Sequence, residues 1–358
     1  MFKKILPLIT VALLIIGCAT PTPTLPAAAT PDQAPATKSL TVMTHSSFAM
    51  TEDLLKEFEK ANNVKVQVLK SGDAGKMLNT ALLNKAAPLA DVIYGVDNTL
   101  LSRALDGGLF EKYDAPALKD VASDFKLDSQ NRALPVDYGD VCLNYDKNYF
   151  ESKKLDLPKS LKDLTDAKYK SLIVVEDPAT SSTGLSFMLL TSKVLGAGFN
   201  DFWKAMRANE VKVAPDWEAA YYTDFSGSSG KGSRPLVVSY ASSPPAEVFF
   251  AKTPPKDAPT GSIATANTCF RQIEFVGIAS GAKNRELAQK WVDFMLSKKF
   301  QEDMPLNMFV YPVIANAALP EVFVKYSAKV ESPVIMSADE IAKNREALIK
   351  TWTEIVVK

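Results

Sequence analysis

The side chains best suited to chemistry in this sequence are polar and aromatic residues that directly follow β-rich runs. His45 and Ser46 follow LTVMT (40–44), and Asp97 follows ADVIYGV (90–96). Three further β-rich runs precede the remaining candidates, which are Ser181, Ser182, Trp217 and Tyr240. In open α/β sheets, ligands bind beyond the carboxyl ends of the strands. These positions therefore predict a binding cleft assembled from several strand ends.

Enzymatic chemistry has little support in the sequence. His45 is the only histidine, so it is the only possible base for a Ser-His-Asp triad, and no G-x-S-x-G motif is present. The HExxH, P-loop and dinucleotide-binding patterns are also absent, and the clustered Cys and His of a structural zinc site are missing. We predict a binding protein that is not an enzyme and needs no cofactor and no resident metal.

The polar candidates also have a structural interpretation. Asp97 is placed to cap the helix expected from TLLSRAL (99–105). Ser181 and Ser182 look like N-cap residues of the helix expected over 181–196, and one of them is expected to have that role. Free N–H groups at such a helix start can also hold an anion or a phosphate.

The aromatic candidates could belong to the core or to the cleft. Trp217 stands beside a proline and two acidic residues, which favours a partly hydrated site. Tyr221 and Tyr222 come one turn later on the same expected helix. Because adjacent helical residues point about 100° apart, at most one of these tyrosines is expected to face the cleft.

The elements that must position these residues alternate between strands and helices in two blocks, which predicts an α/β fold with a sheet covered on both faces. Helices are expected over 51–62, 73–86, 97–108, 181–196 and 284–301. A C-terminal helix is expected over 335–358, where Ser337 and Glu340 have capping-box spacing.

Two long extended segments, 133–146 and 271–280, bridge the two blocks and are expected to run side by side. They predict two hinged lobes, the first formed by 39–137 and 275–334 and the second by 141–271. Cys142 and Cys269 fall on these two segments. A disulfide across the hinge is one hypothesis, and a pair of buried free thiols is the other.

The amino terminus predicts export. Lys3 and Lys4 precede an apolar run that is shorter than the ~20 residues needed to span a bilayer, so residues 1–17 read as a signal peptide. Ile15-Ile16-Gly17-Cys18 resembles a bacterial lipobox, which predicts lipid on Cys18 and an extracytoplasmic, membrane-anchored protein. A plain secretion signal with an incidental cysteine is the alternative. The Pro/Thr/Ala-rich segment 18–38 predicts a semi-stiff tether.

The charge balance limits the partners. The 358 residues carry 41 basic and 41 acidic side chains, without a basic stripe of interleaved aromatics. Nucleic acid is therefore not an expected partner. We expect a monomer.

With these residues in view, the chain resembles bacterial extracytoplasmic solute-binding proteins of the thiamine-binding kind. The matching runs follow one another over almost the entire folded part, and they are LTVMTHSSF (40–48), ADVIYGVDNTLL (90–101), LPVDYGDVCLNYDK (134–147), VVEDPATSSTGL (174–185), PDWEAAY (215–221), LVVSYASSP (236–244) and MFVYPV (308–313). The resemblance implies a two-lobed type II periplasmic-binding-protein architecture, with mixed sheets flanked by helices and two crossing strands between the lobes. It also implies thiamine as ligand, with the phosphates of thiamine as further candidate ligands, and delivery to an ABC permease with its cytoplasmic ATPase.

The resemblance also implies which residues contact the ligand. The positions that fall on the family's contact places are Asp97, Ser181, Trp217, Tyr240 and Phe309, and Tyr138 in the DYG run joins the candidates. Four departures thin the stacking set. Phe309 stands where a tryptophan is usual, His45 where a tyrosine is usual, and Ala246 where another aromatic is usual, and a tryptophan expected shortly after SSF (46–48) is missing.

Thiamine carries a permanent positive charge, which is costly to bury without a partner. Aromatic faces contribute about 0.5–2 kcal/mol each to holding a cation, and Asp97 could supply the opposing charge. An iron(III)-binding relative is the main rival, because His45, Asp97 and Tyr240 lie at places that resemble its ligand set. Such iron binders carry two adjacent tyrosines where Tyr240 is followed by Ala241. A polyamine-like cation is a further alternative.

Overall fold

The computed structural model describes residues 38–228 and 232–358. The predicted signal peptide, Cys18 and all of the predicted tether except Lys38 lie outside the described residues. Within the described part of the chain, none of the helices has the length and the apolar character that crossing a membrane requires.

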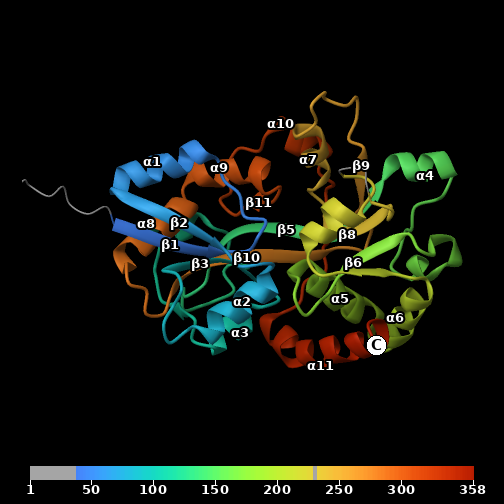
Figure 1. Ribbon diagram of the computed structural model, residues 1–358, viewed down its shortest axis with the longest axis horizontal. Coiled ribbons are helices and arrows are strands. Elements are labelled where there is room, and N and C mark those ends of the chain that lie inside the picture. The colour runs from blue at the N-terminus through green and yellow to red at the C-terminus, as the bar shows by residue number, and fades with distance from the viewer. Residues whose placement is uncertain (1–37, 229–231) are drawn as a thin grey trace, which may run out of the picture. The chain divides into compact units, whose positions relative to one another are not determined.

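The described residues form a mixed sheet covered by helices (Figure 1), which confirms the predicted α/β class. Its strand order is β2-β1-β3-β10-β5-β8-β6-β7. These strands are β1 (Lys38–Thr44), β2 (Val64–Lys70), β3 (Val92–Asp97), β5 (Leu134–Asp146), β6 (Ile173–Glu176), β7 (Lys212–Ala214), β8 (Leu236–Tyr240) and β10 (Phe270–Ala279). Three short strands lie off this path. β4 (Phe110–Glu111) pairs with β10, and β9 (Thr260–Ile263) and β11 (Tyr311–Pro312) pair with β5.

Pairing is parallel at both ends of the sheet and antiparallel in its middle. β1 is parallel to β2 and β3, and β6 is parallel to β7 and β8. Strands β5 and β10 run antiparallel beside each other in between (Figure 1), with Phe270 opposite Val141 and Val276 opposite Leu134. The prediction that the two long extended segments lie side by side is therefore confirmed. The lobe boundaries drawn through them stay a prediction.

The structure contains a disulfide between Cys142 and Cys269, which lie on and just before these two central strands. Both cysteines are buried, and they pack with Ala241. The alternative of two buried free thiols does not describe this structure.

Helices cover the sheet, and their bounds follow the expected ones with small shifts. Those in the first part of the chain are α1 (Glu52–Asn62), α2 (Ala74–Leu83), α3 (Leu101–Asp106) and α4 (Lys147–Lys153). Those in the second part are α5 (Ser182–Leu195), α6 (Phe199–Ala208), α7 (Pro244–Phe249), α8 (Arg285–Met295), α9 (Lys298–Asn307), α10 (Glu321–Tyr326) and α11 (Ala338–Val356). Helix α5 has buried residues around its whole first three turns and contacts β5, β6, β8 and β10.

The single helix predicted over 284–301 is wrong. The structure has two helices there, because α8 ends at Met295 and α9 begins after Ser297. The hydroxyl of Ser297 accepts a hydrogen bond from the N–H of Phe300, which starts a new helix in the manner of an N-cap.

The C-terminal helix α11 is confirmed, and Ser337 caps it by accepting from the N–H of Glu340 at 3.2 Å. Its Trp352 is buried and meets Trp203 of α6 edge-on, with ring centroids 5.5 Å apart. The helix contacts α5 and α6 and also α3. It therefore packs against elements that belong to both predicted lobes.

Candidate functional site

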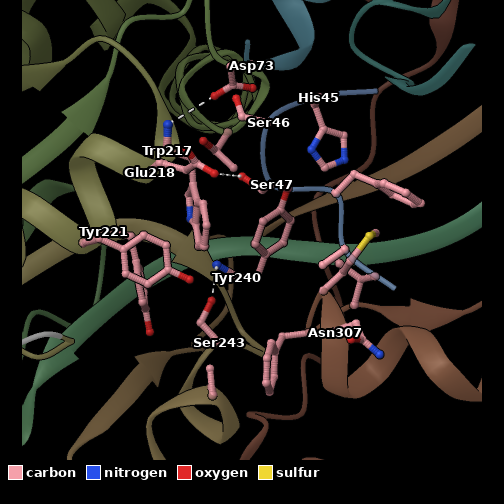
Figure 2. A pocket seen from close by; sticks show the side chains of 18 of the residues that line it. His45, Ser46, Ser47, Asp73, Trp217, Glu218, Tyr221, Tyr240, Ser243 and Asn307 are labelled. Atoms are coloured by element: carbon pink, nitrogen blue, oxygen red, sulfur yellow. Dashed lines mark hydrogen bonds between the residues drawn. The ribbon is translucent and has the colours of Figure 1, made fainter. Parts of the chain in front are cut away.

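A cavity of about 240 Å³ lies where the carboxyl ends of β1, β2 and β8 and the first turn of α5 come together (Figure 2). Many of the predicted candidates line it, and these are His45, Ser46, Ser182, Trp217, Tyr221, Tyr240 and Phe309. They come from segments far apart in the sequence, as the strand-end argument predicts. The structure places Asp97, Tyr138 and Ser181 away from the cavity wall.

One wall of the cavity is a group of aromatic rings around Trp217. The Trp217 ring stacks on Tyr221 with centroids 5.0 Å apart, and Tyr222 meets it edge-on at 5.4 Å. Trp217 Nε1 donates to Ser239 Oγ at 2.9 Å, which fixes the tilt of the indole. Such a fixed ring can offer its face to a ligand without further ordering cost.

The expectation that at most one of Tyr221 and Tyr222 faces the cleft is wrong, since both line the cavity. Residues Ala219–Asp224 form a π-helical turn, η6, rather than the expected α-helix. Its wider turn changes the angle between successive side chains. Tyr221 is buried and donates to Glu247 Oε1 at 3.0 Å, whereas Tyr222 is 49% exposed.

Phe309 and Phe250 also line the cavity, and their ring centroids lie 5.6 Å apart. Phe309 has φ 56°, a left-handed conformation that costs a non-glycine residue about 1–3 kcal/mol. Its carbonyl accepts a hydrogen bond from Ser242 Oγ at 2.7 Å. This bond links the segment before β11 to the segment after β8 and helps to hold Phe309 in place.

Tyr240 connects the cavity to Asp97. The Tyr240 hydroxyl donates to Gln272 Oε1 at 2.5 Å, and Gln272 Nε2 donates to Asp97 Oδ2 at 3.3 Å. Gly139 leaves room for the ring of Tyr240, because any side chain at position 139 would place its Cβ only 2.6 Å from Tyr240 Cδ1. Asp97 therefore lies behind the cavity wall, and it is connected to the cavity through Gln272 and Tyr240 and through its interaction with Ser182.

The carboxylate of Asp97 is fully buried and accepts from the N–H of Thr99 at 2.6 Å. It therefore closes a turn before α3, whose N-cap position is Leu100 rather than Asp97. Burial raises the pKa of Asp97 to about 7, because the hydrogen bonds from Thr99 offset only part of the desolvation. A carboxyl group of this kind is only partly ionised near neutral pH.

The floor of the cavity carries a buried network of His45, Glu274, Tyr94 and Asp137. His45 Nε2 lies 3.6 Å from Glu274 Oε1, and the Tyr94 hydroxyl lies 3.0 Å from Glu274 Oε2 and 2.5 Å from Asp137 Oδ2. Gly95, with φ 98°, permits this arrangement, since a Cβ there would lie 2.3 Å from His45 Cδ2.

Burial and neighbouring charges shift the pKa values within this network in different directions. Burial and the charge of Glu274 raise the pKa of Asp137 well above its usual range. Burial would also raise the pKa of Glu274, but His45 and the neighbouring hydrogen bonds lower it below its usual value. For His45, burial lowers the pKa, and the Glu274 carboxylate more than offsets this and raises it. The pKa of Glu274 is therefore lowered where that of Asp137 is raised, so Glu274 is the more acidic of the two carboxyl groups.

Sequence reasoning missed the acidic residues of the site. Asp73, Glu218 and Glu274 all line the cavity, and Lys70 is the one lysine on the wall among the described residues. Asp73 comes soon after β2, so the strand-end rule could have found it. Glu274 lies inside β10, where neither the rule nor the strand pattern distinguishes it from a core position.

The remaining predicted candidates have other surroundings. Tyr138 stacks between Phe125 and Tyr311, with centroid distances of 4.7 and 5.3 Å, and the guanidinium of Arg271 lies 4.7 Å from its ring. Ser181 is buried at the N-cap position of α5, where its Oγ lies 2.9 Å from Thr183 Oγ1. Neither residue lines the cavity, so a ligand contact of either one stays a prediction.

Among the described residues, no group of three or more His, Cys, Asp or Glu side chains is arranged to hold a metal ion. The cavity instead combines ring faces with carboxylates. Its lining includes three acidic residues, Asp73, Glu218 and Glu274, and one lysine, Lys70, so it has an excess of negative charge. Such a site favours a small organic cation.

Comparison with known proteins points to one family. Residues 87–332 match the family described as bacterial extracellular solute-binding protein. A thiamine-binding periplasmic protein of Escherichia coli (strain K12) is 32% identical over 325 residues, which cover 88% of this chain and 93% of that protein. Its counterpart in Salmonella typhimurium is 33% identical over 326 residues, with the same coverage of 88% and 93%. A solved periplasmic thiamin binding protein superposes with a TM-score of 0.78 at 29% identity, covering 89% of this chain and 96% of its own.

Proposed function

The chain belongs to the bacterial extracellular solute-binding protein family, and on that premise we propose that it captures thiamine and delivers it to an ABC importer. Its fold is the type II periplasmic-binding-protein architecture. The observation that carries the proposal is the cavity between Trp217, Phe309 and the acidic residues, because it pairs ring faces with excess negative charge.

Thiamine suits this cavity on physical grounds. Its thiazolium charge cannot be removed by losing a proton, so the site must supply the compensation. Trp217 and Tyr240 offer ring faces, each of which contributes about 0.5–2 kcal/mol toward a cation. Glu274, whose pKa is lowered, and Glu218 supply the opposing charge. The function is capture and transport, and the protein is not an enzyme.

Titration calorimetry with the purified protein, stripped of carried-over ligand by partial unfolding, tests the proposal. Thiamine is expected to bind at one site and to quench tryptophan fluorescence. Of the four tryptophans, Trp217 lines the cavity, whereas Trp203, Trp291 and Trp352 are buried in the core. Absence of binding, or a charge-transfer colour with ferric citrate in its place, would contradict the proposal.

Glu218→Gln tests the role of the acidic lining. Glu218 Oε1 accepts a hydrogen bond from Ser47 Oγ at 3.3 Å, and glutamine can keep this bond while removing the charge. We expect thiamine to bind about threefold to tenfold more weakly, as calorimetry would show, because one partly solvated charge is lost. A neutral analogue lacking the thiazolium charge should be little affected. Glu286→Gln on the exposed face of α8 is the control, and equal losses for both ligands would remove Glu218 from this role.

The affinity should also depend on pH through His45. His45 faces Glu274, Asp73, Lys70 and Tyr94, and its raised pKa means that it holds a proton at slightly acid pH. A bound cation opposes that proton, so thiamine affinity should rise as the pH rises through the raised pKa of His45 and the side chain becomes neutral.

His45→Gln separates this effect from other titrating groups. Asp97, with a pKa of about 7, also gains negative charge as the pH rises and would act in the same direction. The His45→Gln variant should lose most of the pH dependence measured by calorimetry while still binding thiamine. An unaltered pH profile in this variant would assign the dependence to Asp97 or another group.

We further propose that the protein works outside the cytoplasm as a monomer, held at the membrane by lipid on Cys18. The family's periplasmic members and the lipobox-like sequence ending at Cys18 support this location. A scavenger of this kind gains from staying near the permease and its ATPase. Mass spectrometry of the amino terminus isolated from membranes would reveal the acyl groups, and an unmodified Cys18 would contradict the anchor.

A further inference from the structure

Phe250 is a large apolar side chain that stays 65% exposed although it lines the cavity. It directly follows α7, a short helix that begins with two prolines and lies beside α10 (Figure 1). The N–H of Phe250 donates to the carbonyl of Ala246 at 3.0 Å, one helical turn earlier. Because residues four apart lie on the same face of a helix, the small side chain of Ala246 leaves this face of α7 open for the Phe250 ring.

The α7 segment is fixed to its surroundings by two side-chain hydrogen bonds. Ser243, the residue before α7, lies with its Oγ 2.9 Å from Ser239 Oγ on β8. Glu247 of α7 accepts a hydrogen bond from the Tyr221 hydroxyl at 3.0 Å, which joins α7 to η6. All four residues belong to the second predicted lobe, so the Phe250 ring has a fixed base on that lobe.

The partner of this ring comes from the first predicted lobe. The Phe250 ring meets Phe309 edge-on, with centroids 5.6 Å apart and 65° between the ring planes. Phe249 lies 6.3 Å from the Phe309 ring but does not line the cavity. Ser242 Oγ donates to the Phe309 carbonyl at 2.7 Å, so the backbone and the ring of Phe309 are both held from the segment around α7. Edge-on aromatic pairs attract each other beyond the effect of burial alone.

The contact between Phe250 and Phe309 crosses the mouth of the cavity. Phe250 is mostly in water, whereas Phe309 is only 8% exposed, so the pair spans from the surface to the cavity wall. If the predicted lobes hinge about β5 and β10, this contact must open before a bound molecule can leave past it. A bound molecule would also cover more of the Phe250 ring, which adds an apolar gain to the bound state.

Resting on the proposed function, we propose that Phe250 is a positioning residue that retains thiamine in the cavity by contacting Phe309 across the mouth. It acts after the ligand has entered, because the two rings meet only when the predicted lobes are close together. Its main effect is therefore on the rate of dissociation, and the rate of association depends little on it.

Dissociation of radiolabelled thiamine, chased with an excess of unlabelled thiamine, measures this role in Phe250→Ala. We expect thiamine to leave about threefold to tenfold faster than from the wild type, because one edge-on aromatic contact is lost. Association, followed by stopped-flow tryptophan fluorescence, should change less than about twofold. Phe250→Tyr keeps the ring and should release thiamine at the wild-type rate. Val324→Ala, on the exposed face of α10, is the matched control and should alter neither rate.

A double-mutant cycle with Phe309→Leu separates contact between the rings from a general effect on α7. Leucine keeps apolar bulk in the cavity but removes the ring, so Phe250→Ala should accelerate dissociation much less in this background. An unchanged dissociation rate in Phe250→Ala, or an equal acceleration in both backgrounds, would overturn the inference while leaving thiamine capture intact. Failure of the wild type to bind thiamine would instead overturn the proposed function, and this inference with it.

Discussion

Replacing Trp217 with alanine should weaken thiamine binding by about tenfold or more, which corresponds to about 1.4 kcal/mol. Trp217 lines the cavity, and its indole is held from two sides by the stacked Tyr221 ring and by the hydrogen bond to Ser239 Oγ. A ring that is already fixed offers its face to a cation without paying ordering entropy, so its removal loses the whole contact. Calorimetry is the measurement, because the variant also lacks the fluorescent reporter.

Trp217→Phe is the matched control for this experiment. Phenylalanine keeps a ring face above Tyr221 but loses the Nε1–H that donates to Ser239. It should therefore retain much of the affinity if the ring face carries the contact, whereas a loss equal to that of Trp217→Ala would assign the effect to indole positioning. A folded Trp217→Ala variant with wild-type affinity would remove Trp217 from the site.

The positions of many cavity residues could be predicted because strand ends are readable in a sequence. The β-rich runs before His45, Ser182 and Tyr240 are distinct, and the carboxyl ends of such strands gather at one edge of an α/β sheet. The same rule placed Asp97 at the cavity, but the structure turns its carboxylate toward Thr99 and Gln272. The direction of a side chain at a strand end depends on its hydrogen-bond partners, which come from distant segments.

What could not be predicted depends on contacts between distant segments or on local backbone geometry. Glu274 joins the site only because β10 pairs with β3 and brings it opposite Asp97 and near His45. The π-helical turn that lets both Tyr221 and Tyr222 line the cavity has no simple sequence signal. The break between α8 and α9, in contrast, had a readable cap in Ser297, which an unbroken helical pattern concealed.

Removing the disulfide by the double substitution Cys142→Ala and Cys269→Ala should lower the free energy of unfolding by about 2–5 kcal/mol. The two cysteines are separated by 127 residues in the sequence, so the bond closes a long loop and strongly restricts the unfolded chain. Both are buried in a small cluster with Ala241, so part of the loss should also come from the removed sulfur atoms. Urea unfolding monitored by circular dichroism measures the change.

The chemically reduced wild type separates the cross-link from the packing. It keeps both sulfur atoms but lacks the bond, so it should be less stable than the oxidised protein and more stable than the double alanine variant. Oxidised and reduced proteins that unfold at the same urea concentration would contradict a stabilising role for the bond.

Since neither cysteine lines the cavity, thiamine affinity should change little on reduction. The bond joins the two central strands, β5 and β10, where both enter the second predicted lobe. A large loss of affinity on reduction would therefore mean that the cavity depends on these strands moving as one unit.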